Sequence, residues 1–244
     1  MMNNKHYLLL IAHPDDESMF FIPTLFNLIK ESTPGSVRIL CLSNGNFDGL
    51  GKLREKELHA AAAIISDKVQ VSIENCIDIQ DGPNECWSPK IIASIVNKYI
   101  RKHCLQDVVL ITFDKYGVSG HKNHIDTHSA AMEYYQMREN KEIRELWTLY
   151  SVQNVLKKYI PIVPILELIL IWIFSLFQTN SKMRNINTGT RQYMMLNPML
   201  VWKAMKAHTS QFVWYRRLFV IFSRYSYVND IKIHKRVHDC KTKT

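Results

Sequence analysis

The sequence is poor in cysteine, glycine and proline. Its five cysteines are odd in number and scattered, and no CxxC pair occurs. This pattern argues against a secreted disulfide framework and against a cysteine-built zinc module, and it fits a reducing compartment. Eight glycines, eight prolines and a hydrophobic content of 47% are ordinary globular values, which exclude a fibrous or disordered chain. Because a single core can span 244 residues, we expect one domain over residues 1–244.

Acidic residues are missing from a long stretch late in the chain. Between Leu168 and Asn229 there is no Asp or Glu, while eight Lys and Arg residues lie there, and the formal net charge of the chain is +9. A basic face beside apolar residues suits either an anionic membrane surface or a nucleic acid, because both gain from Coulomb attraction and counterion release.

The chain also lacks a clean transmembrane run. The most apolar segment of this region, Ile160–Phe177, is broken by Pro161, Pro164 and Glu167, whereas a bilayer span needs about 20 mostly apolar residues without a central charge. We predict instead a short helix from about Ile165 to Phe177 that packs in a core or lies at the headgroup boundary. This interpretation favours an anionic membrane surface as partner, and we expect no nucleic-acid partner.

Short apolar runs alternate with helical patterns through the first 150 residues. The predicted strands are Tyr7–Ala12, Val37–Leu42, Val69–Ile73, Val108–Phe113 and Leu146–Val152. The predicted helices are Phe20–Lys30, Lys52–Ile65, Pro89–His103 and Asn123–Arg138. This order predicts a Rossmann-like, open and mostly parallel α/β sheet with flanking helices over residues 1–152. Residues 153–244 lack the alternation, which predicts a mostly helical, basic and apolar closing region that could face a membrane.

One histidine and three carboxylates directly follow the first predicted strand. Residues 12–17 read AHPDDE, at the carboxyl end of a strand, where open α/β sheets form their sites. A solvated turn would need only one capping acid. So much charge beside a buried strand is costly unless it binds a cation, and we therefore interpret this segment as part of a metal site.

A matching group follows the strand Val108–Phe113. Residues 114–124 read DKYGVSGHKNH, with His121 and His124 three positions apart. On a helix that begins there, both imidazoles lie on one face. Combined with the HPDD segment at the end of the neighbouring strand, this pair completes a two-histidine, one-carboxylate metal site with spare groups for acid–base chemistry, which suits zinc and also iron(II).

Motifs spread along nearly the whole chain resemble one family. They are AHPDDE (12–17), SNGN (43–46), GLGKLREKEL (49–58), TFDKYGVSGHKNHI (112–125), SVQNVLKKYI (151–160), AHTSQ (207–211) and WYRRLFVIFSRY (214–225). In this order they resemble the N-acetylglucosaminyl-phosphatidylinositol de-N-acetylases, within the zinc-dependent LmbE-like N-deacetylases.

The resemblance implies a role for each site residue. By matched position, His13, Asp16 and His124 bind zinc, Asp15 is the general base, and His121 assists the developing charge. It further implies removal of the acetyl group from N-acetylglucosaminyl-phosphatidylinositol, the second step of GPI-anchor biosynthesis, at the cytoplasmic face of the endoplasmic reticulum. Relatives commonly carry an amino-terminal membrane anchor. The polar start MMNNKH leads us to expect neither an anchor nor a signal peptide here.

Further residues are candidates for binding or orienting roles. Arg54 could bind the inositol phosphate bidentately, Asn44 could contact the sugar, and His208 could reach the site from the carboxyl-terminal region. Glu17 and Asp114 are candidates for orienting the histidines. Each also has an ordinary explanation, as an exposed helix arginine, a turn residue, a packed histidine or a capping acid.

Two other classes of function remain open. A metal-dependent N-deacetylase of a soluble amino-sugar conjugate would keep the same site without needing the apolar and basic late region. A catalytically idle membrane-binding or partner-binding subunit would need neither the HPDD nor the GHxxH set, so their presence counts against it.

Overall fold

The computed structural model describes residues 5–137, 140–159, 166, 189–195 and 197–236. Within these residues, seven strands form one sheet in the order β3-β2-β1-β4-β5-β7-β6. The strands are β1 (His6–Ile11), β2 (Val37–Cys41), β3 (Gln70–Ile73), β4 (Val108–Phe113), β5 (Ile143–Leu149), β6 (Thr190–Met194) and β7 (Val228–Lys235).

The first five strands pair in parallel. β1 lies between β2 and β4, β3 extends the sheet beyond β2, and β5 extends it beyond β4. Every residue of β4 is buried, and only the first residue of β1 is not, which explains their continuous apolar sequences, since a parallel sheet is covered on both faces. The predicted α/β sheet with mostly parallel strands is confirmed.

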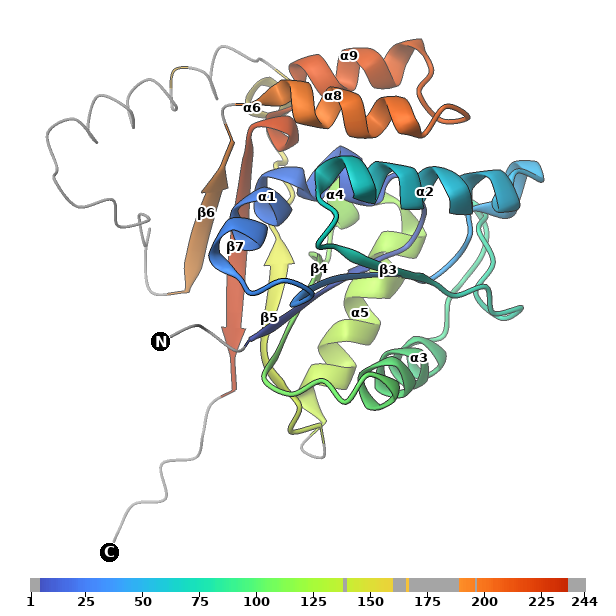
Figure 1. Ribbon diagram of the computed structural model, residues 1–244. Helices are drawn as coiled ribbons and strands as arrows, with labels where there is room; N and C mark the ends of the chain where they lie inside the picture. Colours follow the sequence, from blue (N-terminus) through green and yellow to red (C-terminus); the bar gives the residue numbers. More distant parts are fainter. Residues whose placement is uncertain (1–4, 138–139, 160–165, 167–188, 196, 237–244) are drawn as a thin grey trace, which may run out of the picture.

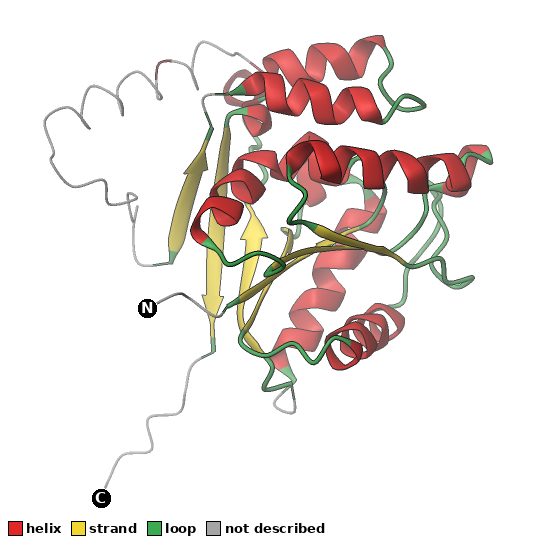
Figure 2. Ribbon diagram, viewed as in Figure 1, coloured by secondary structure: helices red, strands yellow, loops and turns green. Residues whose placement is uncertain are grey.

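Helices cover both faces of the sheet (Figures 1 and 2). The helices are α1 (Ile22–Glu31), α2 (Gly51–Ile65), α3 (Pro89–Lys102), α4 (Gly117–Gly120), α5 (Lys122–Gln136), α6 (Val155–Tyr159), α8 (Pro198–Ala207) and α9 (Trp214–Phe222). In Figure 1, α1 and α2 lie on one face and α3 and α5 on the other. α8 packs on α2, and α9 packs beside α8, so this pair forms an outer layer above the first face.

The carboxyl-terminal region is less helical than predicted. Besides α6, α8 and α9 it contributes β6 and β7, and β7 pairs antiparallel with both β5 and β6. In β7, Ile231 and Ile233 alternate with Lys232 and His234, which is the period-2 pattern of a half-buried strand. Because antiparallel strands at a sheet border carry polar side chains on one face, their sequences lack the long apolar runs of β1 and β4.

The predicted helix from Ile165 to Phe177 lies outside the described residues, apart from Leu166. Among the described residues, no helix is both long and apolar enough to cross a bilayer.

The sheet order fixes where a site can form. From β1 the chain moves outward to β2 and β3, and then returns to the other side of β1 with β4. At such a switch point the loops that leave the two central strands diverge and open a crevice at their carboxyl ends. The segments that follow β1 and β4 carry the two predicted metal-binding motifs.

Candidate metal centre and active site

Three histidines from the two strand ends meet in one cluster. His13 follows β1, His121 caps the start of α5, and His124 lies in the first turn of α5. One ring nitrogen of each lies within 4.8 Å of the others. The predicted HxxH pair and the predicted HPDD segment are therefore neighbours in space.

His124 is held so that one nitrogen faces a carboxylate. Its Nδ1 lies 3.1 Å from the carbonyl oxygen of Gly117, to which it can donate, and its ring stacks on Phe113 with 4.0 Å between centroids. Nε2 then lies 3.0 Å from Oδ1 of Asp16. A backbone acceptor on one ring nitrogen fixes the tautomer that presents the other nitrogen to a metal.

His13 is oriented in a similar way from its opposite nitrogen. Its Nε2 lies 3.1 Å from Oδ1 of Asp81 and 3.1 Å from Oδ1 of Asn123, while Nδ1 lies 3.8 Å from Oδ2 of Asp16. Burial opposes the charged imidazolium, but the hydrogen bond to Asp81 and the nearby carboxylates raise the pKa of His13 above its ordinary value. The acceptors at Nε2, the Asp81 carboxylate and the Asn123 amide oxygen, make the Nδ1 lone pair a stronger ligand.

Asp16 is ionised and rigidly placed. The backbone amides of Ala12 and His13 donate to its Oδ2 at 3.1 and 2.8 Å. Burial alone would raise the pKa of Asp16, but His124 and His13 hold it well below its usual range. A buried, anionic carboxylate between two imidazoles is a ready metal ligand.

His121 completes the cluster. Its ring centroid lies 4.9 Å from that of His13 and 4.8 Å from that of His124. Burial and the two neighbouring histidines lower the pKa of His121, so it is neutral at pH 7. Its Nδ1 is buried without a hydrogen-bond partner in the described part of the chain. His121 is thus as well placed to bind a metal as to contact a reacting group.

These residues fit a divalent metal. Two zinc ligands with bonds of 2.0–2.2 Å and a tetrahedral angle lie about 3.3–3.6 Å apart. The separations from Asp16 to His124 (3.0 Å) and to His13 (3.8 Å) bracket this range. A neutral, unpartnered imidazole beside an ionised carboxylate is the donor set that zinc or iron(II) prefers.

Asp15 has an unusual backbone conformation beside this centre. Its φ is 118°, a value that costs a non-glycine residue about 1–3 kcal/mol. Its Oδ2 accepts from Arg54 at 3.3 Å and from Arg216 of α9. The short π-helix η1 (Glu17–Phe21) begins two residues later, and such irregular turns recur at functional sites.

Arg54 bonds protein groups through both terminal nitrogens of its guanidinium, while its Nε has no hydrogen-bond partner among the described residues. Its guanidinium donates to the carbonyl oxygens of Pro14 (2.7 Å) and Gly45 (2.9 Å) and to Asp81 (3.3 Å), besides Asp15. The residue is 6% exposed. In this conformation Arg54 holds the carboxylates in place rather than presenting a free fork to a phosphate.

Asn44 and His208 are also committed to protein contacts. Asn44 is buried and donates to Glu55 at 2.9 Å. His208 has no exposed surface, and its Nε2 lies 2.7 Å from Oε1 of Glu17. Glu17 in turn accepts from the backbone amide of Asp15 at 3.2 Å. The structure therefore brings His208 to the site through Glu17 and Asp15, and not to a surface that substrate could reach.

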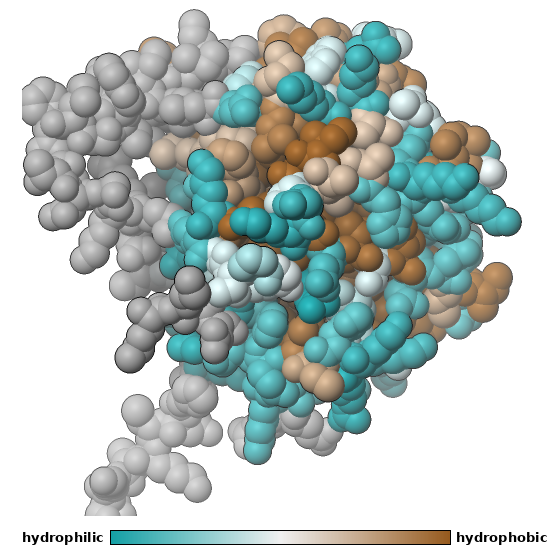
Figure 3. All heavy atoms as spheres, in the orientation of Figure 1, coloured by the Kyte–Doolittle hydropathy of each residue, from teal (hydrophilic) through white to brown (hydrophobic). Residues whose placement is uncertain are grey.

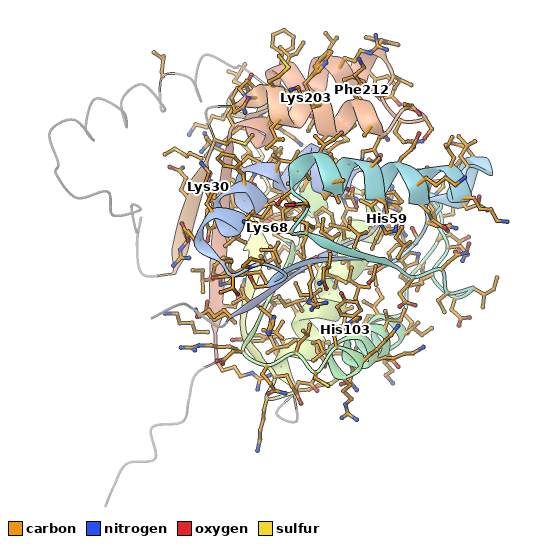
Figure 4. All side chains as sticks on the ribbon, viewed as in Figure 1. Lys30, His59, Lys68, His103, Lys203 and Phe212 are labelled. Atoms are coloured by element: carbon orange, nitrogen blue, oxygen red, sulfur yellow. The ribbon has the colours of Figure 1, made fainter. Side chains whose placement is uncertain are left out.

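The other histidines that the structure describes lie outside the cluster. His59 is exposed on α2, and His103 follows α3 at the amino-terminal edge of the sheet (Figure 4). His128, one turn after His124, packs with its Nδ1 2.9 Å from the carbonyl oxygen of Phe113.

Comparison with known proteins identifies the family. The sequence model of the GlcNAc-PI de-N-acetylase family matches residues 8–135, which is more than half of the chain. The matched range includes His13, Asp16, His121 and His124 of the candidate metal centre. The chain belongs to the GlcNAc-PI de-N-acetylase family. The resemblance inferred from the motifs is confirmed.

Relatives of this family match most of the chain. One from Schizosaccharomyces pombe is 35% identical, with 92% of this chain and 85% of the relative covered. Those from Saccharomyces cerevisiae (32% identical; 93% and 80% covered) and Bos taurus (31%; 92% and 81%) are named N-acetylglucosaminyl-phosphatidylinositol de-N-acetylase.

Solved structures of other deacetylases share the fold. An N,N′-diacetylchitobiose deacetylase from Pyrococcus horikoshii superposes with a TM-score of 0.63 at 16% identity, covering 98% of this chain and 88% of that one. A zinc-inhibited form of a teicoplanin deacetylase gives 0.58 at 13% identity, covering 95% and 99%. These likenesses support the α/β architecture of the GlcNAc-PI de-N-acetylase chain.

Three polar residues of the site were not predicted. Asp81 lies in the loop after β3 and Asn123 between the two histidines of the HxxH pair, and both contact His13. Arg216 reaches Asp15 from α9. Asp81 lies in the segment that leaves the carboxyl end of β3, so its position after a predicted strand is a signal in the sequence. Nothing local marks Arg216 among the other basic residues of its region.

Proposed function

We propose that this protein hydrolyses the acetamide of N-acetylglucosaminyl-phosphatidylinositol, which yields glucosaminyl-phosphatidylinositol and acetate, the second step of GPI-anchor biosynthesis. The observation that carries the proposal is the buried group of histidines and carboxylates at the ends of β1 and β4, in a chain of the GlcNAc-PI de-N-acetylase family. The names of the relatives supply the substrate.

In this proposal His13, Asp16 and His124 bind zinc, with iron(II) as the alternative metal. The tautomers fixed by Asp81 and Gly117 support the assignment, because each leaves one histidine nitrogen directed at Asp16. A bound divalent metal supplies a Lewis acid that polarises the acetamide carbonyl and activates water near neutral pH.

Asp15 acts as the general base. Its Oδ2 is occupied by Arg54 and Arg216, while Oδ1 has no hydrogen-bond partner within the described residues. The two guanidinium groups keep the carboxylate in one orientation, and the free oxygen takes the proton of the attacking water. A general base contributes typically 10²–10⁴-fold to the rate.

His121 stabilises the carbonyl oxygen as it gains negative charge. Its half-buried ring lies beside His13 and His124, where a hydrogen bond to a developing oxyanion is stronger than in water. The amine nitrogen must gain a proton before the C–N bond breaks, because an amine is otherwise a poor leaving group. Asp15 can return the proton that it took from water, or His121 can donate one when its ring is protonated.

The protein works at an anionic membrane surface, on the cytoplasmic face of the endoplasmic reticulum. Supporting this, apolar side chains of α6 and α9 are exposed, and Trp214 of α9 is 71% exposed. Figure 3 shows hydrophobic side chains at the surface of the α8–α9 layer among hydrophilic ones. Basic residues Lys157, Lys203 and Arg217 belong to the same helices, and amphipathic helices with basic flanks bind anionic bilayers.

A flotation assay tests the membrane part of the proposal. We expect the protein to float with vesicles that contain phosphatidylserine at low salt, and to float less at high salt because the attraction is screened. Failure to float at low salt would remove the membrane-surface partner while leaving the chemistry untouched.

The alternative function is deacetylation of a soluble amino-sugar conjugate at the same metal site. This alternative stays open because the chain shares its fold with a diacetylchitobiose deacetylase. The deciding experiment measures acetate release by the purified protein from N-acetylglucosaminyl-phosphatidylinositol and from free N-acetylglucosamine. We expect release from the lipid-linked sugar only. Release from soluble sugars alone would favour the alternative, and release from neither would point to a catalytically idle subunit.

A further inference from the structure

An apolar cavity of about 540 Å³ lies directly beside the metal centre. Its walls come from η1, α4, α6 and α9, and they include the side chains of Phe20, Tyr159, Tyr215, Leu218, Phe219 and Phe222. This volume is within the range of small-molecule binding sites. The chemistry assigned to His13, Asp15 and their neighbours makes no use of it.

One end of the cavity reaches the catalytic groups. Arg216 lines the cavity and also donates to Oδ2 of Asp15. Val118 and Ser119 line it as well, and they precede His121 by three and two residues. A ligand in the cavity therefore adjoins whatever occupies the metal centre.

A second cation, Lys158, lies in the wall without a carboxylate partner in the described residues. Its Nζ donates to the carbonyl oxygen of Val118 at 2.7 Å, and it lies 5.5 and 5.9 Å from the ring centroids of Tyr159 and Tyr225. Burial lowers the pKa of Lys158. A partly desolvated ammonium with a single neutral acceptor is stabilised when an anion binds beside it.

The other end of the cavity opens on apolar surface. Leu218 and Phe222 line the cavity and are 46% and 41% exposed, and they lie one turn apart on α9. Leu156 of the neighbouring helix α6 is exposed too. The cavity thus combines two cations, one of which contacts Asp15, with apolar walls that reach the surface, and a phospholipid likewise combines an anionic phosphate with apolar acyl chains.

We propose that this cavity is the subsite for the phosphodiester and the adjoining glycerolipid of the substrate, with Lys158 and Arg216 on the phosphate and Leu218 and Phe222 on the lipid. The inference rests on the proposed function and deepens it, because it names the residues that distinguish a lipid-linked amino sugar from a soluble one. A free phosphorylated conjugate shares the phosphate contacts but lacks those of the lipid.

The lipid contacts are tested with Leu218→Ser against the matched control Ile221→Ser. Both positions are aliphatic and similarly exposed on α9 (46% and 42%), but Ile221 does not line the cavity. Initial rates are measured with the diacyl substrate and with a water-soluble analogue that keeps the phosphodiester and lacks the acyl chains. We expect Leu218→Ser to lower kcat/KM about tenfold for the diacyl substrate only, and Ile221→Ser to leave both values unchanged.

The phosphate contact is tested with Lys158→Met against Lys90→Met, an exposed lysine of α3 on the opposite face of the sheet, which should leave KM and kcat unchanged. Lys158→Met is expected to raise KM for the diacyl substrate and for the analogue alike, with kcat little changed. Thermal unfolding is measured for all four variants to check that each is folded.

Two results would overturn the subsite. One is an equal effect of Leu218→Ser and Ile221→Ser on the diacyl substrate. The other is an unchanged KM for both substrates in Lys158→Met. Failure of the proposed function itself is recognised separately, because the wild-type protein would then release no acetate from the diacyl substrate before any variant is compared.

Discussion

In the proposed mechanism, Asp15 is the residue on which the chemistry of the site depends most. Its positive φ is maintained by its surroundings: the backbone amides of Ser18 and Met19 donate to its carbonyl oxygen at 3.1 and 2.9 Å, and Arg54 and Arg216 hold its carboxylate. Strain that persists in this way is typical of residues whose position matters for function.

The variant Asp15→Asn keeps the size of the side chain but cannot accept a proton. We expect its turnover of N-acetylglucosaminyl-phosphatidylinositol to fall by about 10²–10⁴-fold, with the bound metal, measured by mass spectrometry, unchanged. His124→Ala is the comparison variant and should lose both metal and turnover. Wild-type turnover in Asp15→Asn would show that another group is the base.

Gly45 is needed because Arg54 passes directly over it. A Cβ at Gly45 would overlap the Arg54 guanidinium, whereas a Cβ at Gly49 would meet nothing within 4 Å, although both glycines have similar positive φ values of 69° and 74°. Gly45→Ala and Gly49→Ala therefore carry the same backbone strain, about 1 kcal/mol, and differ in the clash.

From this difference we predict that Gly45→Ala displaces Arg54 and lowers kcat by about 10–100-fold, since small misplacements of catalytic groups are costly. Gly49→Ala should lose only stability. The rates of acetate release by the two variants are the measurement, and equal rates would mean that the position of Arg54 is unimportant.

Site residues that directly follow a strand could be predicted from the sequence, whereas site residues from distant elements could not. His13 and Asp16 follow β1 directly, so strand prediction and charge sufficed to find them. Arg216 comes from α9, about 200 residues after Asp15. Because this contact depends on how α9 packs, no local pattern could have predicted it.

Among the elements, α2 and the loop between α8 and α9 are joined by one carboxylate. Glu57 of α2 accepts from Thr209 Oγ1 (2.6 Å), Ser210 N (2.8 Å) and Ser210 Oγ (2.6 Å), and it is 4% exposed. This contact secures the loop that follows His208 and leads to Arg216. Burial opposes ionisation of Glu57, but the three hydrogen bonds outweigh it and lower its pKa below the ordinary 4.5.

Replacing Glu57 by Gln is expected to reduce the free energy of unfolding by about 1–3 kcal/mol at pH 7. Because the folded state has the lower pKa, the stabilisation by Glu57 is complete above pH 4.5 and is lost as the pH falls through the folded-state value. Denaturant unfolding of wild type and Glu57→Gln should therefore converge at low pH.

The control for this variant is Glu74→Gln, whose carboxylate makes no hydrogen bond within the part of the chain described. Glu74→Gln should leave stability nearly unchanged at every pH. If the difference between wild type and Glu57→Gln stayed constant down to pH 3, the ionised form of Glu57 would not be what holds the loop.

Strands whose residues are buried on both faces of the sheet could be predicted from the sequence, and partly exposed strands could not. β1 and β4 are covered on both faces, and their apolar runs gave bounds within a residue of those observed. β6 and β7 are partly solvated and carry polar residues, so their weaker alternation does not mark them as strands within a region that the sequence predicts to be mostly helical.

At the scale of the whole molecule, the order of strands in the sheet brings the motifs after β1 and β4 together in one site. The residues after β1 and β4 are separated by about a hundred positions, yet parallel pairing of these two strands places their carboxyl ends side by side. The same chain adds the α8–α9 layer, which supplies Arg216, exposes apolar surface and lines the cavity beside the metal centre. In the proposed function, this layer connects the metal centre to the surface that contacts lipid.

The central claim is that a metal held at this centre is required for deacetylation of the lipid-linked sugar. The most direct test is acetate release from N-acetylglucosaminyl-phosphatidylinositol by the full chain, measured together with bound metal, before chelation, after chelation and after zinc is restored. We predict that turnover disappears with the metal and returns with zinc. Undiminished turnover by protein shown to be free of metal would contradict the account.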